Sequence, residues 1–229
     1  DDDICGQIGV GLNRGAELSN MEIVGGEVAV LPEMVNGIDI SGTCLGYVDK
    51  GKVITGERCE SGDLIVALRS SGVHSNGLTL ARKVFQNAGY TMKDKAPGLS
   101  GTVGEELLTP TEIYVKDVLR IRDEYDPHGL IDITGGGLRN LLRMRKGLRY
   151  IIDDPVKPHA LFGKIAELGE VSEKEMYQTF NMGMSFMIVA SEDDAENIIS
   201  DIGDAEIVGR VEKGNGVLYE PGDLLYENY

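Results

Sequence analysis

The chain is poor in several residue types, and each scarcity narrows what it can be. Its 229 residues include no tryptophan and only three cysteines, Cys5, Cys44 and Cys59. An odd number of cysteines without a close C-x-x-C pair argues against a disulfide framework or a zinc site and is typical of reduced thiols in the cytosol. No stretch approaches the roughly 20 apolar residues that a membrane-spanning helix needs. We therefore expect a cytoplasmic protein that does not act in a membrane.

Basic residues are also scarce, with 22 lysines and arginines against 38 acidic residues and a net charge of −16. A nucleic-acid-binding surface normally shows the opposite bias, so we expect no nucleic-acid partner. One basic cluster stands out, formed by Arg139, Arg143, Arg145, Lys146 and Arg149. It is either a solvated helix face or a surface that attracts phosphate.

Strand-like and helix-like segments alternate without a repeat, which predicts a mixed α/β fold. The polar stretch 55–63 links two expected domains, residues 1–56 and 57–229. In the first domain we expect a helix over 4–18 and strands at 21–24, at 39–48 and from 53. In the second, the apolar runs 64–68 and 184–190 are typical of buried strands. Residues 159–168 and 192–202 are expected to be helical, and a further helix is expected to start with Thr109 as its cap and Pro110 in its first turn.

The stretch SSGVHSNGLTLARKVF, residues 70–85, joins a small-residue loop to a helix. Ser75 or Asn76 is a good N-cap, and Gly89 stands where the helix should end. Free backbone N–H groups and the helix dipole make such an N-terminus a site for phosphate or another anion. An ordinary capped helix after a turn is the alternative. His74 is the only one of the three histidines that lies within a small-residue loop.

Three other segments have a functional and a structural interpretation. The glycines of ITGGGLRNLL, 135–137, form either a ligand-binding loop or a tight turn between a strand and a helix. Glu27 follows a glycine pair and is either an oxygen ligand for Mg²⁺ or a solvated side chain. Asn181 precedes a buried strand, where its side chain caps the backbone or contacts a polar ligand.

Five segments follow one another in order along the chain: GGE, SSGVHSNG, LLTPTEIYVK, ITGGGL and EMYQTFNMG. In this order they resemble the ATP-dependent aminoimidazole ribonucleotide synthetase family, also called phosphoribosylformylglycinamidine cyclo-ligase. HSNG and TGGG recur in a wider superfamily with selenophosphate synthetase, thiamine monophosphate kinase and a hydrogenase maturation protein. LLTPTEIYVK and EMYQTFNMG resemble the synthetase itself.

The resemblance implies ATP- and Mg²⁺-dependent ring closure of formylglycinamidine ribonucleotide to aminoimidazole ribonucleotide in purine biosynthesis. It implies a homodimer whose N-terminal domains build an intersubunit barrel and whose C-terminal domain is α/β. It makes Glu27 a metal or nucleotide-side carboxylate and His74 a candidate for acid–base catalysis. The substrate-binding residues that it implies are Gly72, Ser75, Asn76, Gly77, Thr134, Gly135, Gly136, Gly137, Asn181 and Gly183.

The chain also departs from the family pattern. Val28 and Val30 stand where GGETAEMP would place a hydroxyl and a carboxylate, and Asp132 stands where the family tends to have histidine. An Asp-Gly-Val-Gly-Thr-Lys loop and an Asn-Asp pair, which serve ATP and metal in the family, are expected upstream of Asp1. Two other functions stay open: a related ATP-dependent kinase or synthetase, and a non-catalytic dimeric scaffold, which Val28 and Val30 favour.

Overall fold

The computed structural model describes residues 2–229, and its contacts define two compact units, one ending at Val53 and one running from Ile54 to Tyr229. In the first unit, helix α1 (Asp2–Ser19) confirms the helix predicted over 4–18. The predicted strands at 21–24, 39–48 and from 53 are wrong, because residues 20–55 contain only turns, bends and the short 3-10 helix η1 (Lys50–Lys52). A strand is stable only when its backbone groups are paired. This segment forms no such ladder within its unit, and side chains such as Val24 and Tyr47 are exposed.

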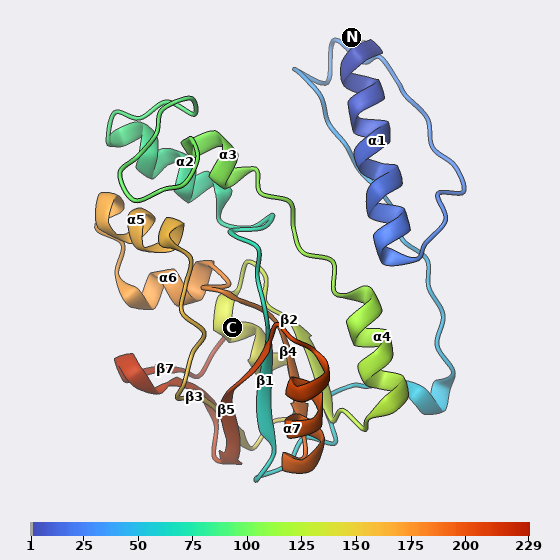
Figure 1. Cartoon of the computed structure of the whole chain (residues 1–229), viewed down its shortest axis with the longest axis vertical. Coiled ribbons are helices and arrows are strands. Elements are labelled where there is room, and N and C mark those ends of the chain that lie inside the picture. Colours follow the sequence, from blue (N-terminus) through green and yellow to red (C-terminus); the bar gives the residue numbers. More distant parts are fainter. Residues whose placement is uncertain (1) are drawn as a thin grey trace. The chain divides into compact units, whose positions relative to one another are not determined.

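The second unit is built around a seven-stranded sheet with the order β2-β4-β1-β5-β3-β6-β7 (Figure 1). Neighbouring strands pair antiparallel, except for the parallel pair β3 and β6. The strands are β1 (Leu64–Arg69), β2 (Gly129–Asp132), β3 (Leu148–Ile152), β4 (Met184–Ala190), β5 (Ala205–Lys213), β6 (Gly216–Tyr219) and β7 (Leu224–Tyr226). The mixed α/β prediction and the strands expected at 64–68 and 184–190 are confirmed.

Six α-helices and two 3-10 helices accompany this sheet in the described chain. They are α2 (Leu78–Asn87), α3 (Val103–Leu107), α4 (Val115–Glu124), η2 (Gly137–Arg143), α5 (Ala160–Gly169), α6 (Glu173–Thr179), α7 (Glu192–Asp201) and η3 (Glu220–Gly222). No helix within residues 2–229 is long and apolar enough to cross a membrane. A reciprocal capping box between Thr102 and Glu105 starts helix α3.

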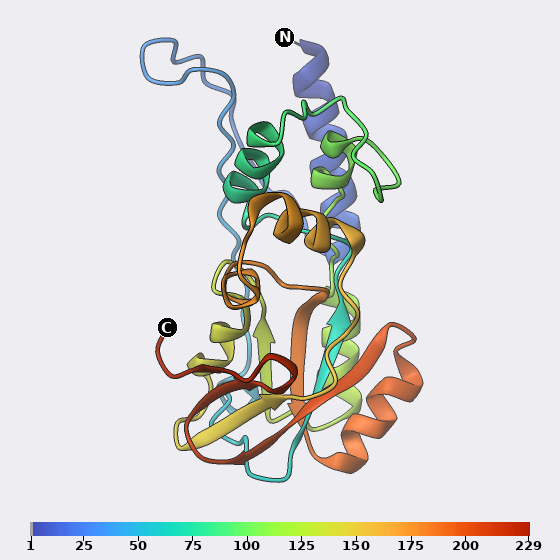
Figure 2. The ribbon, with the colours of Figure 1, turned by 90° about the vertical axis from the view of Figure 1, so that its left-hand side faces the viewer.

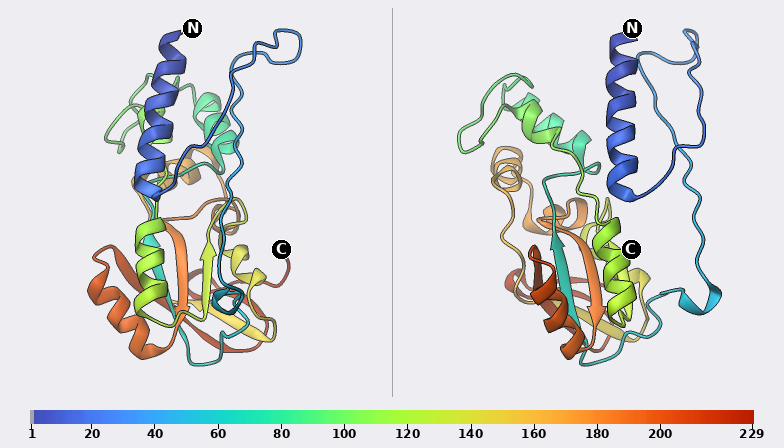
Figure 3. Two further views of the ribbon diagram at one scale, coloured as in Figure 1. Left: turned by 90° about the vertical axis from the view of Figure 1, so that its right-hand side faces the viewer. Right: turned by 45° about the vertical axis from the view of Figure 1, so that its right-hand side comes forward.

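Both faces of the sheet are buried, which explains the nearly unbroken apolar run in β1. Ile65 and Ala67 belong to the core cluster shared with α2, α5, α6 and η2. Val66 and Leu68 point the other way, into the cluster shared with α4 and α7. Figure 3 shows α4 and α7 flanking β1 and β4, while Figures 1 and 2 show α2 and α5 together beyond the end of β1. The loop at 70–77 leaves from that same end.

The helix expected to begin at Thr109 and Pro110 begins instead at Val115. Residues 109–114 are non-helical because contacts with the end of β1 and its loop hold their backbone. Ser71 Oγ donates to the Pro110 carbonyl at 2.6 Å, and the Tyr114 hydroxyl donates to the Arg69 carbonyl at 2.6 Å. Tertiary hydrogen bonds have therefore overridden a local helix signal.

Candidate functional site

A small polar cavity of about 60 Å³ lies where three loops meet. Strands β1 and β2 both pair antiparallel with β4, so they run parallel to each other. Their carboxyl ends therefore lie at the edge of the sheet where β4 begins, with Arg69 opposite Met184 and Asp132 opposite Phe186. The lining residues are Val73, His74, Ser75, Asn76, Thr111, Asp132, Ile133, Thr134, Asn181 and Ser185. The topology thus brings the HSNG, TGGG and FNMG segments to one place.

Five of the predicted site residues line this cavity: His74, Ser75, Asn76, Thr134 and Asn181. His74 and Asn181 are buried, whereas Ser75 is exposed. The cavity therefore has a floor of buried polar groups and a rim that solvent reaches. The helix cap was expected at Ser75 or Asn76, but Gly77 holds the N-cap position of α2, with φ of 75°, and no side chain caps the helix.

His74 connects three elements through both of its ring nitrogens. Its Nε2 accepts from the backbone N–H of Ser71 at 3.1 Å and from that of Glu112 at 3.3 Å. Because Nε2 is the acceptor of both bonds, the proton of the neutral ring lies on Nδ1 and faces Ser185 Oγ at 2.8 Å. Its backbone has φ of 60°, which histidine tolerates better than most residues.

This environment favours the uncharged imidazole. Burial, and to a lesser extent the nearby His159, lowers the pKa of His74. Protonation at Nε2 would break two backbone hydrogen bonds. The arrangement therefore supports a positioning role for His74 more directly than it supports acid–base catalysis.

Asn181 ties the FNMG segment to the loop after β1. Its Nδ2 donates to the Gly72 carbonyl at 2.9 Å, and its Oδ1 accepts from the Gly183 N–H at 2.9 Å. The side chain is only 4% exposed. Of the two interpretations of Asn181, the structure favours backbone capping, which fixes the cavity wall.

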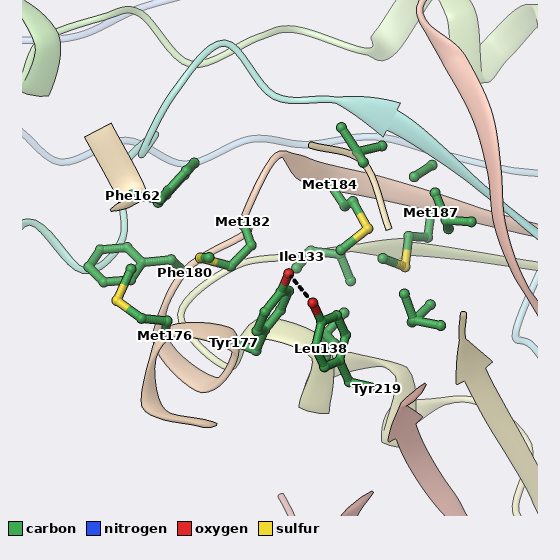
Figure 4. Close-up of a cluster of buried hydrophobic side chains, with 14 of the residues drawn as sticks. Ile133, Leu138, Phe162, Met176, Tyr177, Phe180, Met182, Met184, Met187 and Tyr219 are labelled. Carbon is green, nitrogen blue, oxygen red and sulfur yellow. Dashed lines mark hydrogen bonds between the residues drawn. The ribbon is translucent and has the colours of Figure 1, made fainter. Parts of the chain in front are cut away.

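Two of the predicted glycines are required by close packing against protein. A Cβ on Gly77 would lie 2.2 Å from the Phe180 ring, and one on Gly137 would lie 2.0 Å from the Tyr177 carbonyl oxygen. Both have positive φ, 75° and 54°. Figure 4 shows Tyr177 and Phe180 in the buried layer next to Ile133, with the Tyr177 hydroxyl bonded to that of Tyr219 at 2.9 Å.

The remaining predicted glycines do not line the cavity, although they shape the loops around it. Gly135 faces Asn76, because a Cβ there would lie 3.0 Å from Asn76 Oδ1. A Cβ on Gly136 would lie 2.8 Å from Asn140 Oδ1 and 2.9 Å from the Tyr229 hydroxyl oxygen. Gly72 and Gly183 provide the backbone groups that Asn181 binds.

Thr111 and Ser185 are lining residues that the motifs did not predict. Ser185 could have been recognised in the sequence, because it is a polar residue within the otherwise apolar run of strand β4, where it is buried. Thr111 lies within the LLTPTEIYVK segment that resembles the synthetase, but its place at the cavity depends on the long-range contacts of residues 109–114.

Glu27 lies in the other unit, where it is exposed and belongs to no helix, strand or turn. Among residues 2–229, no group of three His, Cys, Asp or Glu side chains could hold a metal ion. The oxygen, nitrogen and sulfur donors of these residues therefore do not form a Mg²⁺ site by themselves.

Several members of the basic cluster contact other parts of the protein, although Arg143, Arg145 and Lys146 are exposed. Arg139 and Arg143 lie over the Tyr229 ring, with the guanidinium carbons 5.7 and 4.7 Å from its centroid. Arg145 donates to the Cys59 carbonyl at 2.9 Å. The glycine segment is followed by 3-10 turns and not by the expected regular helix, so the predicted helix face does not form.

Residues 60–219 match the family model described as AIR synthase related protein, C-terminal domain. The chain belongs to the AIR synthase family. It is 48% identical to the phosphoribosylformylglycinamidine cyclo-ligase of Methanopyrus kandleri over 95% of this chain and 65% of that protein. The enzyme of the same name from Thermoplasma volcanium is 44% identical over 94% of this chain and 64% of its own length. The chain thus spans about 65% of the length of these curated AIR synthase relatives, and the resemblance seen in its motifs is confirmed.

Two solved structures of other proteins share the fold of this chain. Thiamine monophosphate kinase from Aquifex aeolicus matches with a TM-score of 0.50 and 17% identity over 76% of this chain and 55% of that one. The hydrogenase maturation protein HypE of E. coli matches with a TM-score of 0.50 and 21% identity over 76% of this chain and 51% of its own.

Proposed function

We propose that the complete protein catalyses the ATP-dependent closure of formylglycinamidine ribonucleotide to aminoimidazole ribonucleotide, a step of purine biosynthesis. The observation that carries this proposal is the 44–48% identity, over at least 94% of this chain, to relatives named for that reaction. The convergence of three family motifs on one polar cavity supports it. The protein would act in the cytoplasm as a homodimer.

The size of the cavity favours binding of the reacting end of the substrate. About 60 Å³ accepts a small functional group but not a whole nucleotide. The ribose phosphate would then lie outside, near the uncapped N-terminus of α2, whose backbone N–H groups and dipole suit an anion. ATP, when bound, would supply the phosphoryl group that makes the formamide oxygen a good leaving group.

The residues of this chain would then hold the substrate in position and exclude water from its reacting end. Ser75 and Thr134 offer hydroxyl groups at the rim, and His74 and Asn181 hold the loop that carries Ser75. Holding the two reacting ends of one molecule in contact accounts for a large part of the acceleration in such a reaction. Glu27 and Mg²⁺ remain part of the proposal through the family resemblance alone.

The test is release of ADP by the complete protein in the presence of Mg²⁺ and formylglycinamidine ribonucleotide. We expect ADP, phosphate and aminoimidazole ribonucleotide in equal amounts, and no ADP when the ribonucleotide is omitted. A panel with thiamine monophosphate and selenide as acceptors tests the related kinase and synthetase functions. A folded protein that releases no ADP with formylglycinamidine ribonucleotide would contradict the proposal.

A further inference from the structure

Asp132, the last residue of β2, is the one acidic side chain among the described residues that line the cavity. The other lining groups are apolar, hydroxyl or amide groups, together with the neutral ring of His74. A single carboxylate in otherwise neutral surroundings gives the cavity a preference for a positively charged group. The motifs that carried the family resemblance assign no role to this residue.

No cation or donor of the described chain satisfies this carboxylate. Among the groups that the structure describes, none is hydrogen-bonded to Asp132, and burial raises its pKa despite the opposing effect of Arg143. The Arg143 guanidinium is bound to the Tyr229 hydroxyl. Asp132 is only partly desolvated by the cavity and remains exposed, so its carboxylate is open to a ligand that carries a positive charge.

We propose that Asp132 binds the amidine group of formylglycinamidine ribonucleotide and accepts the proton which that group releases on ring closure. This inference rests on the proposed function. The amidine is a strong base and is a planar cation at neutral pH. Its paired N–H groups match the two oxygens of a carboxylate, as those of a guanidinium do.

The proton transfer completes the chemistry of ring closure. The amidinium gives one N–H proton to the Asp132 carboxylate, whose raised pKa makes it a better base than an ordinary aspartate. This frees a nitrogen lone pair, which forms the C–N bond to the formyl carbon, while the C–O bond to the phosphorylated oxygen breaks and its electron pair leaves with phosphate. The ring that forms is still protonated, and loss of a ring C–H proton to solvent gives the neutral aminoimidazole.

The same pairing would provide specificity. An analogue with an amide in place of the amidine, formylglycinamide ribonucleotide, is neutral and would turn a carbonyl oxygen or a single N–H₂ group toward Asp132. A site built for a hydrogen-bonded cation rejects the analogue that lacks it, because its own charged group is then left unpaired.

The experiment measures calorimetric affinity of the complete protein for both ribonucleotides, together with turnover of the amidine. The variant is Asp132→Asn, and Asp204→Asn is the control for an equal change in net charge at an exposed position. Wild type and Asp204→Asn should prefer the amidine by about 10- to 100-fold, as expected for a charge-assisted bond. Asp132→Asn should reduce this preference to threefold or less, keep the affinity for the amide, and lower turnover by roughly 100-fold or more.

Thermal unfolding separates this result from misfolding, and Asp132→Asn should not unfold earlier than wild type, since Asp132 is exposed and no described group is hydrogen-bonded to its carboxylate. A folded Asp132→Asn protein that keeps the amidine preference overturns the inference, and so does one that loses affinity for both ligands alike. Both outcomes leave the proposed function standing if wild type turns the amidine over. A wild-type protein that binds neither ribonucleotide overturns the proposed function and the inference with it.

Discussion

Replacing Gly137 by alanine is expected to destabilise the protein by roughly 2–5 kcal/mol, from left-handed backbone strain and from overpacking together. The added Cβ would lie 2.0 Å from the Tyr177 carbonyl oxygen at a position with φ of +54°. That oxygen belongs to the backbone of α6, so it cannot be moved aside by a change of rotamer. Urea unfolding of Gly137→Ala and wild type, followed by circular dichroism, measures the difference.

Gly89→Ala is the matched control. Its φ is +85°, and nothing lies within 4 Å of a Cβ built there, so only backbone strain of about 1–2 kcal/mol is expected. Equal losses in the two variants would show that the contact between the glycine turn and α6 is looser than described. The TGGG segment would then not be fixed at the cavity by this contact.

Asn181→Asp is expected to cost roughly 3–5 kcal/mol at neutral pH, the range seen when a buried charge loses its compensation. The change replaces the amide that donates to the carbonyls of Gly72 and Val73 by a carboxylate oxygen that repels them. Burial and the carbonyl dipoles raise the pKa of the introduced carboxyl above its unfolded value of about 3.9.

The pH dependence has a definite sign. Because the folded pKa is raised, the stability lost relative to wild type is largest above that pKa and shrinks as the pH falls through it, where the neutral carboxyl can again donate to Gly72. Unfolding curves of both proteins from pH 8 to pH 4 measure this difference. Asn197→Asp, on the exposed surface of α7, controls for the general effect of an added charge. A loss at Asn181→Asp that does not change with pH would contradict the bonding assigned to this side chain.

Local patterns in the sequence predicted the parts of the fold that depend on burial. The run at 64–68 is apolar on both faces because β1 is central in a sheet covered on both sides, and that pattern is visible without a structure. Helices α1 and α2 were likewise predicted from apolar residues at helical spacing. Strands β3 and β7 were not predicted, since β7 has three residues and both depend on pairing with β6.

Expectations failed where distant contacts decide the local structure. Residues 109–114 carry helix signals, but hydrogen bonds to the loop after β1 hold them out of a helix. The apolar alternation at 39–48 predicted a strand that has no ladder within its unit. A strand signal predicts a capacity for pairing, and the partner has to come from elsewhere in the fold.

In the candidate site, too, local sequence patterns were predictive and features that depend on distant contacts were not. Motifs identified His74, Thr134 and Asn181, because glycine-rich turns and their neighbours are recognisable in a sequence. They did not predict that the side chains of Asn181 and His74 form hydrogen bonds with the protein backbone. Those bonds depend on where the fold places Gly72, Ser71 and Glu112. The carboxylate of Asp132 appeared in the sequence only as a departure from a family pattern, and its place in the cavity follows from the pairing of β2 with β4.

A crystal structure of the complete protein with formylglycinamidine ribonucleotide would show whether the three loops bind the substrate. We predict that the amidine end of the ligand occupies the cavity between the loops at 70–77 and 132–137, within hydrogen-bond distance of Asp132, with the phosphate toward the N-terminus of α2. An ordered ligand bound at another place, with this cavity still lined only by protein, would contradict the claim that the three loops form the substrate site.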